Sequence, residues 1–130
     1  WAKLKGIKHI YFSNPANILS NDTMFDFAVS DLLISDTSSI LYEYLITRNP
    51  IIVADTEYVD LHKMLPEMDI TTIANKMTKN DDILKLIEKV FVYHDTNNFD
   101  KMLNNCFYYN DGKSVERISN FLSSPILSPS

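Results

Sequence analysis

Apolar residues in the first half of the chain alternate between short continuous runs and helically spaced groups. The run 31–35 (DLLIS) lacks polar alternation, which is typical of a strand buried on both faces of a parallel sheet. Residues 40–48 (ILYEYLITR) carry apolar side chains at 40, 41, 44 and 45, which form one face of a helix. Pro50 then opens a second apolar run, PIIVA. Strand, helix and strand together predict a right-handed βαβ unit and therefore a parallel sheet.

Further elements are predicted on both sides of this unit. Residues 8–13 (KHIYFS) indicate a short strand that Pro15 ends, and residues 22–29 indicate a short helix. Residues 55–67 are expected to form an irregular loop, and residues 70–74 fit either a strand or a helix. The pattern as a whole predicts a three-layer α/β domain with a small parallel sheet.

Three more helices are predicted from apolar periodicity in the second half of the chain. Asp81 is expected to cap the first helix, and Ser114 to cap and begin the last. The last helix is expected to bury its apolar residues. The apolar positions of the three helices are Ile83, Leu84, Ile87, Val90 and Phe91, then Phe99, Met102, Leu103, Cys106 and Phe107, then Val115, Ile118, Phe121 and Leu122.

Length and composition fit one globular domain, predicted over residues 1–123 with a frayed tail at 124–130. The chain has 130 residues, 45% of them hydrophobic, enough to bury a core without staples. Its single cysteine excludes an internal disulfide and fits a reducing, cytoplasmic compartment. A net charge of -5 argues against a nucleic-acid partner, and the sequence shows no membrane span or signal peptide. Because the chain begins with Trp1, we expect it to be a piece of a longer protein.

The turn Asp36-Thr37-Ser38-Ser39, between the first βαβ strand and its helix, carries the clearest chemistry. Ligands of open α/β sheets bind beyond the carboxyl ends of the strands, where a helix N-terminus offers N–H donors to an anion. Two serine hydroxyls add donors there, so the turn fits a pyrophosphate. Glu43, one helical turn further on, is placed to accept hydrogen bonds from ribose hydroxyls.

Each of these residues also has a plain structural interpretation. Asp-Thr-Ser-Ser is a good helix cap, and a glutamate on a helix is most often solvated. His9, His62 and His94 have no partner spacing, and Cys106 lies on an apolar helix face, so we expect neither a catalytic histidine nor a metal site. Gly112-Lys113-Ser114 is no P-loop, because the required glycine is replaced by phenylalanine. Tyr108 and Tyr109 are expected to pack.

The segment SDLLISDTSSILYEYLITRNPIIV resembles the signature of the CDP-glycerol glycerophosphotransferases, the teichoic-acid and capsule polymerases. Members show an aspartate, an aromatic or small residue, a Ser-Ser pair, an acidic residue four places on, and a Lys/Arg-x-Pro-apolar strand. The matching positions are Asp36, Thr37, Ser38, Ser39, Glu43 and Arg48-Asn49-Pro50-Ile51. The closing DGKSVERISNFL is also similar to the family's final helix. The chain departs at Thr37, where tyrosine is usual, and lacks the family's catalytic histidines, which lie upstream.

The resemblance implies a Rossmann-like, donor-binding part of the C-terminal half of a GT-B fold. By the same resemblance, Thr37, Ser38 and Ser39 would contact the donor's phosphates and Glu43 its ribose, with Asp36 in support. The parent enzyme would transfer polyol phosphate from a CDP-linked donor to a teichoic-acid or capsule polymer at the inner membrane face. It would use no other cofactor and an acceptor domain outside this chain, and the isolated chain would be inactive.

Two alternatives stay open from the sequence. A UDP-sugar glycosyltransferase or UDP-N-acetylglucosamine 2-epimerase shows a similar acidic turn, helix and proline strand, although the epimerase turn usually has two glycines at the positions of Ser38 and Ser39. Thr56-Glu57 after the strand also resembles the epimerases. The other alternative is an interaction module without catalysis that kept the fold. Affinity for CDP, for UDP or for neither separates the three.

Overall fold

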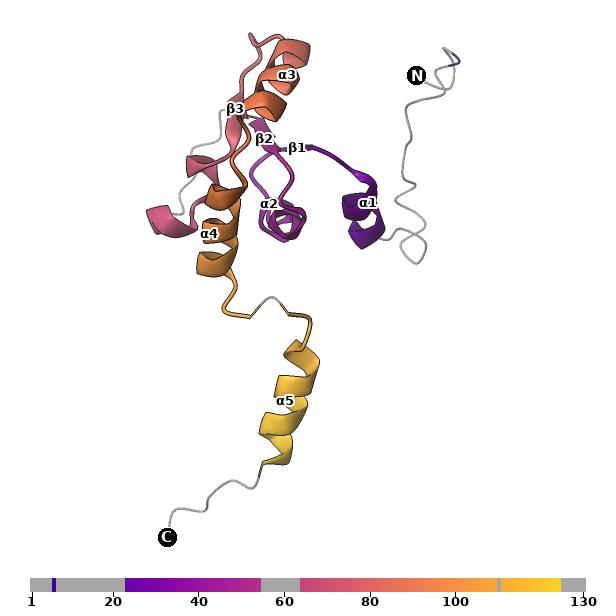
Figure 1. Ribbon diagram of the computed structural model, residues 1–130, viewed down its shortest axis with the longest axis vertical. Helices are drawn as coiled ribbons and strands as arrows, with labels where there is room; N and C mark the ends of the chain where they lie inside the picture. Colours follow the sequence, from indigo (N-terminus) through magenta and orange to yellow (C-terminus); the bar gives the residue numbers. More distant parts are fainter. Residues whose placement is uncertain (1–5, 7–22, 55–63, 110, 125–130) are drawn as a thin grey trace. The chain divides into compact units, whose positions relative to one another are not determined.

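The computed structural model describes residues 6, 23–54, 64–109 and 111–124, and the chain divides into two compact units (Figure 1). The first unit, Trp1–Ser30, contains α1 (Thr23–Val29), which confirms the short helix predicted there. Phe27 is buried, and its carbonyl accepts a hydrogen bond from the Ser30 hydroxyl just past the end of the helix. The predicted strand at 8–13 lies outside the described residues.

The second unit, Asp31–Ser130, is built on a parallel sheet of three strands in the order β1-β2-β3. The strands are β1 (Leu33–Ser35), β2 (Ile51–Ala54) and β3 (Asn75–Met77). Leu33 pairs with Ile51, and Ile52 pairs with Asn75, so all three carboxyl ends lie at one edge of the sheet. The α/β class with a small parallel sheet is therefore confirmed.

Burial differs between the central strand and its neighbours. In β2, Ile51 and Ile52 are fully buried, as the apolar run predicted. In β1, Ile34 is 42% exposed, so the prediction of burial on both faces is wrong for this strand. Among the described strands β1 has a neighbour on one side only, which leaves it less covered than the central strand.

The helix between β1 and β2 confirms the predicted βαβ unit. It consists of α2 (Ile40–Tyr44) and a 3₁₀ turn, η1 (Leu45–Thr47), and ends at Arg48, whose φ of 59° is left-handed. Leu41, Tyr44 and Leu45 are buried, in agreement with the apolar face read from the sequence. Packing of this face against the sheet orients the N-terminal turn of α2.

In its described part, residues 64–74, the connection from β2 to β3 has two 3₁₀ turns, η2 (Pro66–Met68) and η3 (Ile70–Thr72). The ambiguous stretch 70–74 is therefore a tight turn that leads into a strand. β3 was not predicted, because Asn-Lys-Met offers no apolar run. Its hydrogen bonds to β2 form between residues far apart in sequence.

Three helices follow: α3 (Ile83–Tyr93), α4 (Thr96–Cys106) and α5 (Ser114–Ser123). Asp82, and not Asp81, caps α3, since its carboxylate accepts hydrogen bonds from the Leu84 and Lys85 amides. In α3 Val90 is buried, whereas Leu84 and Phe91, expected on the same face, are 70% and 48% exposed. In α4 the predicted face is confirmed, with Phe99, Met102 and Leu103 buried.

The last helix has the predicted place but not the predicted burial. Its N-cap is Lys113, so Ser114 is its first residue and not its cap. The expected buried residues Val115, Ile118, Phe121 and Leu122 are all exposed, by 60% or more. The spacing of apolar residues predicts which side chains share one face of a helix. Whether that face is buried depends on another part of the structure packing against it. The prediction of a buried face on α5 is therefore wrong for this structure.

Candidate functional site

The candidate site is the turn that joins β1 to α2. β1 ends at Ser35 and α2 begins at Ile40, so residues 36–39 form the whole connection at the carboxyl end of the strand (Figure 1). All four residues are exposed. Leu41 and Tyr44, the next buried residues, lie inside the helix and hold its first turn against the sheet. The predicted place of this polar turn, between the first strand and the helix of the βαβ unit, is confirmed.

The serine pair does not act as a side-chain cap. Ser39 occupies the N-cap position with helical dihedrals (φ -60°, ψ -25°), and its side chain makes no capping hydrogen bond. The backbone carbonyls start the helix instead: Ser38 accepts from the Leu41 amide, and Ser39 accepts from the Tyr42 amide at 3.0 Å. The side-chain hydrogen bond that a helix-capping role of Ser39 would require is therefore not formed. Both hydroxyls remain accessible at a helix start, where anions are favoured.

Asp36 and Glu43 flank the serine pair. The Asp36 carboxylate accepts a hydrogen bond of 3.4 Å from the Ser35 hydroxyl, which turns it toward its own strand. Glu43 is exposed and follows Ser39 by one helical turn, with its amide bonded to the Ser39 carbonyl at 3.3 Å. Side chains four residues apart on a helix are neighbours. The arrangement therefore places the Ser39 hydroxyl and the Glu43 carboxylate on the same exposed side of α2, and Ser38 directly precedes them in the exposed turn.

The loop after β3 is closed on itself. The Asp81 carboxylate accepts hydrogen bonds from the Thr78 amide at 2.7 Å and from the Thr78 hydroxyl at 2.9 Å. The backbone hydrogen bond from Thr78 is the main cause that lowers the pKa of Asp81 below its usual value. Both groups are already partnered, and β2 separates this loop from the serine turn. The loop therefore stabilises the start of α3 and offers little to a ligand.

A tyrosine that the sequence analysis did not single out lies one turn into α2. The Tyr42 hydroxyl donates to the Met64 sulfur at 3.0 Å and accepts from the Ile70 amide at 3.4 Å. These contacts tie the connection between β2 and β3 to the helix that starts at the serine pair. The sequence carried no signal for this role of Tyr42, because its partner Met64 lies 22 positions further along the chain.

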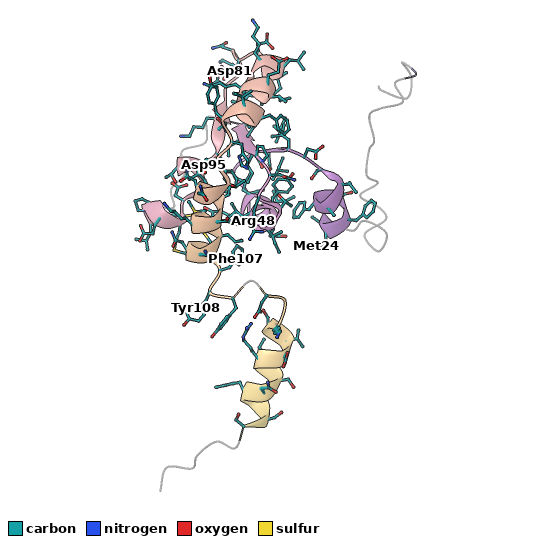
Figure 2. All side chains as sticks on the ribbon, viewed as in Figure 1. Met24, Arg48, Asp81, Asp95, Phe107 and Tyr108 are labelled. Atoms are coloured by element: carbon teal, nitrogen blue, oxygen red, sulfur yellow. The ribbon has the colours of Figure 1, made fainter. Side chains whose placement is uncertain are left out.

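The opposite end of the helix is held by α4 (Figure 2). The Arg48 guanidinium pairs with Asp100, and the Arg48 carbonyl accepts a hydrogen bond of 2.6 Å from His94 Nε2. The His94 ring also meets Phe99 edge-on at 4.6 Å. His94 is thus part of the packing between η1 and α4. His9 and His62 lie outside the described residues.

The remaining candidates from the sequence have structural contacts. The Cys106 thiol lies 3.7 Å from the Met68 carbonyl, and burial raises the pKa of this thiol, which disfavours the reactive thiolate. Tyr108 and Tyr109 pack edge to face, and Arg117 stacks over Tyr109, although Tyr108 stays 90% exposed (Figure 2). In the described part of the chain, no three His, Cys, Asp or Glu residues gather as a metal site would require.

Residues 16–124, most of the chain, match the family described as CDP-Glycerol:Poly(glycerophosphate) glycerophosphotransferase. The chain belongs to this family. The match includes the serine turn, α2 and all three strands, and it confirms the resemblance found in the sequence. Because this is a family of transferases, the chain is a glycerophosphotransferase-type domain.

No curated protein and no solved structure matched the chain significantly. Among the described residues, none of the helices has the length and apolar character that crossing a bilayer requires.

Proposed function

We propose that the chain binds the CDP-linked donor of a glycerophosphotransferase at the turn 36–39. The observation that carries this proposal is the accessible Ser38-Ser39 pair, which makes no side-chain cap at the start of α2. It is supported by the family match, because the family's described donor is CDP-glycerol. Thr37, Ser38 and Ser39 would take the phosphates, Glu43 the ribose hydroxyls, and Asp36 would support the turn.

In the proposed reaction an acceptor hydroxyl attacks the glycerol-linked phosphorus of CDP-glycerol. The bond from this phosphorus to the bridging oxygen breaks, glycerol phosphate passes to the acceptor, and CMP leaves with the electron pair. Negative charge builds on the CMP phosphate as the bond breaks. Hydroxyl donors and the amides of a helix start, already in place, stabilise such charge. The share of the reaction assigned to this chain is therefore to bind the donor and stabilise the leaving group.

The remaining parts of the proposal concern the parent enzyme. We infer that its acceptor is a teichoic-acid or capsule polymer at the inner membrane face, and that it needs no cofactor beyond the donor. The catalytic base and the acceptor domain would be supplied outside this chain, in a two-domain GT-B arrangement. Selectivity for CDP over UDP would distinguish this enzyme from the UDP-sugar enzymes.

The test is a titration of the chain with CDP and UDP, followed by backbone amide resonances. Shifts that saturate and cluster at residues 36–41 and Glu43, with CDP preferred, would support the site. Each hydroxyl should contribute about 0.5–1.5 kcal/mol to binding, so Ser38→Ala with Ser39→Ala should weaken CDP binding by about fivefold to a hundredfold. Ser119→Ala, at an exposed serine of α5, is the matched control.

Folding can be separated from binding in the same variants. Because Ser39 makes no capping hydrogen bond, the double alanine variant should change the free energy of unfolding by less than about 0.5 kcal/mol. Amide resonance shifts that saturate at other residues, with residues 36–41 unaffected, would show that the nucleotide does not bind at the proposed site. Preference for UDP would favour the UDP-sugar alternative, and no binding of either nucleotide would favour an interaction module.

A further inference from the structure

An Asp-Gly sequence stands directly before the last helix. The chain has two glycines, and only Gly112 follows an aspartate, Asp111. Aspartates followed by glycine are the ones most prone to isomerise, because glycine leaves its own amide nitrogen unshielded. Gly112 has a φ of 73°, and a Cβ placed on it would meet no atom of the described residues within 4 Å beyond its chain neighbours. The turn is therefore open at the glycine.

The reaction of an Asp-Gly pair proceeds through a cyclic imide. The Gly112 amide nitrogen attacks Cγ of the protonated Asp111 carboxyl, a C–N bond forms, and the amide proton leaves with the carboxyl hydroxyl as water. Water then opens the ring. Addition at the side-chain carbonyl restores aspartate, whereas addition at the main-chain carbonyl gives isoaspartate, in which the chain continues through the former side chain. Only the protein and water take part.

The Asp111 carboxyl is held in the state that this reaction cannot use. Its two oxygens accept hydrogen bonds from Arg117, and one of them also accepts the Lys113 amide at 3.1 Å. Imide formation consumes the carboxylate, so these contacts have to break. The hydrogen bond from Arg117, and after it that from Lys113, lowers the pKa of Asp111 from 3.8 to about 2. The protonated, reactive fraction at neutral pH is thereby lowered by about sixtyfold.

The contact between Arg117 and Asp111 depends on the first turn of α5. The Arg117 amide donates to the Lys113 carbonyl at 3.0 Å, and the Arg117 guanidinium lies 3.7 Å above the Tyr109 ring. Both contacts hold Arg117 in place beside the carboxylate. The side chains of Arg117 and Asp111 remain 34% and 44% exposed, so water reaches the carboxyl whenever Arg117 leaves it.

We propose that Asp111 is a site of isoaspartate formation that Arg117 keeps unmodified while α5 is folded. Isoaspartate carries its carboxylate directly on the main chain, one carbon nearer than aspartate does. The modified residue therefore no longer reaches Arg117 and the Lys113 amide together, and the first turn of α5 loses this anchor. The inference is independent of the proposed donor site.

The experiment follows isoaspartate in the 130-residue chain during several weeks at neutral pH and body temperature. A protease that cleaves before aspartate but not before isoaspartate, combined with mass spectrometry, measures the modified fraction at residue 111. Arg117→Gln should accumulate isoaspartate at least about tenfold faster than the unchanged chain, because more of Asp111 is protonated and no ion pair has to break. Lys101→Gln, at an exposed lysine of α4, removes the same charge and should leave the rate unchanged.

A second variant separates the loss of Arg117 from a general loosening of α5. Ser119→Gly weakens the helix at an exposed position and keeps Arg117, so its rate should stay near that of the unchanged chain. Equal rates in Ser119→Gly and Arg117→Gln would show that helix fraying controls the reaction and would overturn the role of Arg117. Equal rates in Arg117→Gln and the unchanged chain would overturn it as well. Isoaspartate formation in the unchanged chain as fast as in a short peptide of the same sequence would overturn the protection itself.

Discussion

At the scale of single residues, Asp111 shows how one side chain fixes the start of a helix. Its carboxylate binds the Arg117 guanidinium through both oxygens, with one contact of 2.8 Å. It also accepts a hydrogen bond of 3.1 Å from the Lys113 amide. Gly112 between them has a φ of 73°, a left-handed conformation that glycine adopts without strain. Arg117 in turn lies 3.7 Å above the Tyr109 ring.

We predict that Asp111 titrates far below an ordinary aspartate. The hydrogen bond from Arg117, followed by that from Lys113, lowers the pKa of Asp111 to about 2. Its contribution to stability should therefore be complete above the usual pKa of 3.8 and disappear as the pH falls through about 2. Carboxyl carbon resonances followed against pH would measure this.

The control for that prediction is Arg117→Gln. This variant removes the charge and the bidentate contact, so the pKa of Asp111 should rise toward its ordinary value. The variant should also lose the acid-range part of the stability profile. An unchanged pKa in Arg117→Gln would show that the backbone amide of Lys113 alone depresses it.

At the scale of elements, burial of the α2 face decides whether the candidate turn is held in place. Leu41 is 1% exposed, so Leu41→Ala should lower the free energy of unfolding by about 2–5 kcal/mol. Leu84→Ala is the matched control, because Leu84 is a helical leucine with 70% of its surface exposed. Chemical denaturation measures both. A change below about 0.5 kcal/mol for Leu41→Ala would contradict the helix register.

The helices also show where periodicity and burial diverge. Leu103 on α4 and Leu122 on α5 both belong to regular apolar faces, yet Leu103 is 3% exposed and Leu122 is 75% exposed. The residue pattern is equally regular in both helices. Among the described elements, α4 packs against η1 and η2, with contacts such as Asp100 with Arg48.

At the scale of the whole molecule, the proposed function assigns donor binding to this chain and the catalytic base to another part of the parent enzyme. We predict that the 130-residue chain alone releases no CMP above background from CDP-glycerol and an acceptor. The physical reason is that the proposed site binds the donor, whereas the group that deprotonates the acceptor is proposed to lie outside this chain. Chromatographic detection of CMP is the measurement, with a full-length family enzyme as positive control. Turnover by the chain would place the catalytic base within these residues.

The sequence alone determined the parts of this protein that depend on neighbouring residues. Apolar runs and a helical face predicted the βαβ unit, and the motif around Ser38 and Ser39 identified the family. A polar turn between an apolar run and an amphipathic helix needs no distant contact to be recognised. The place of the turn and the helix start at Ile40 were therefore predicted correctly.

Tertiary structure decided the features that depend on pairs of distant residues. β3 exists because its backbone bonds to β2, which its polar sequence could not reveal. Ile34 is 42% exposed although it lies in an apolar run, and the α5 face is exposed although its pattern resembles a buried one. The bridge from Tyr42 to Met64 joins positions 22 apart. In each case the deciding energy comes from a surface or a hydrogen-bond partner that local sequence does not specify.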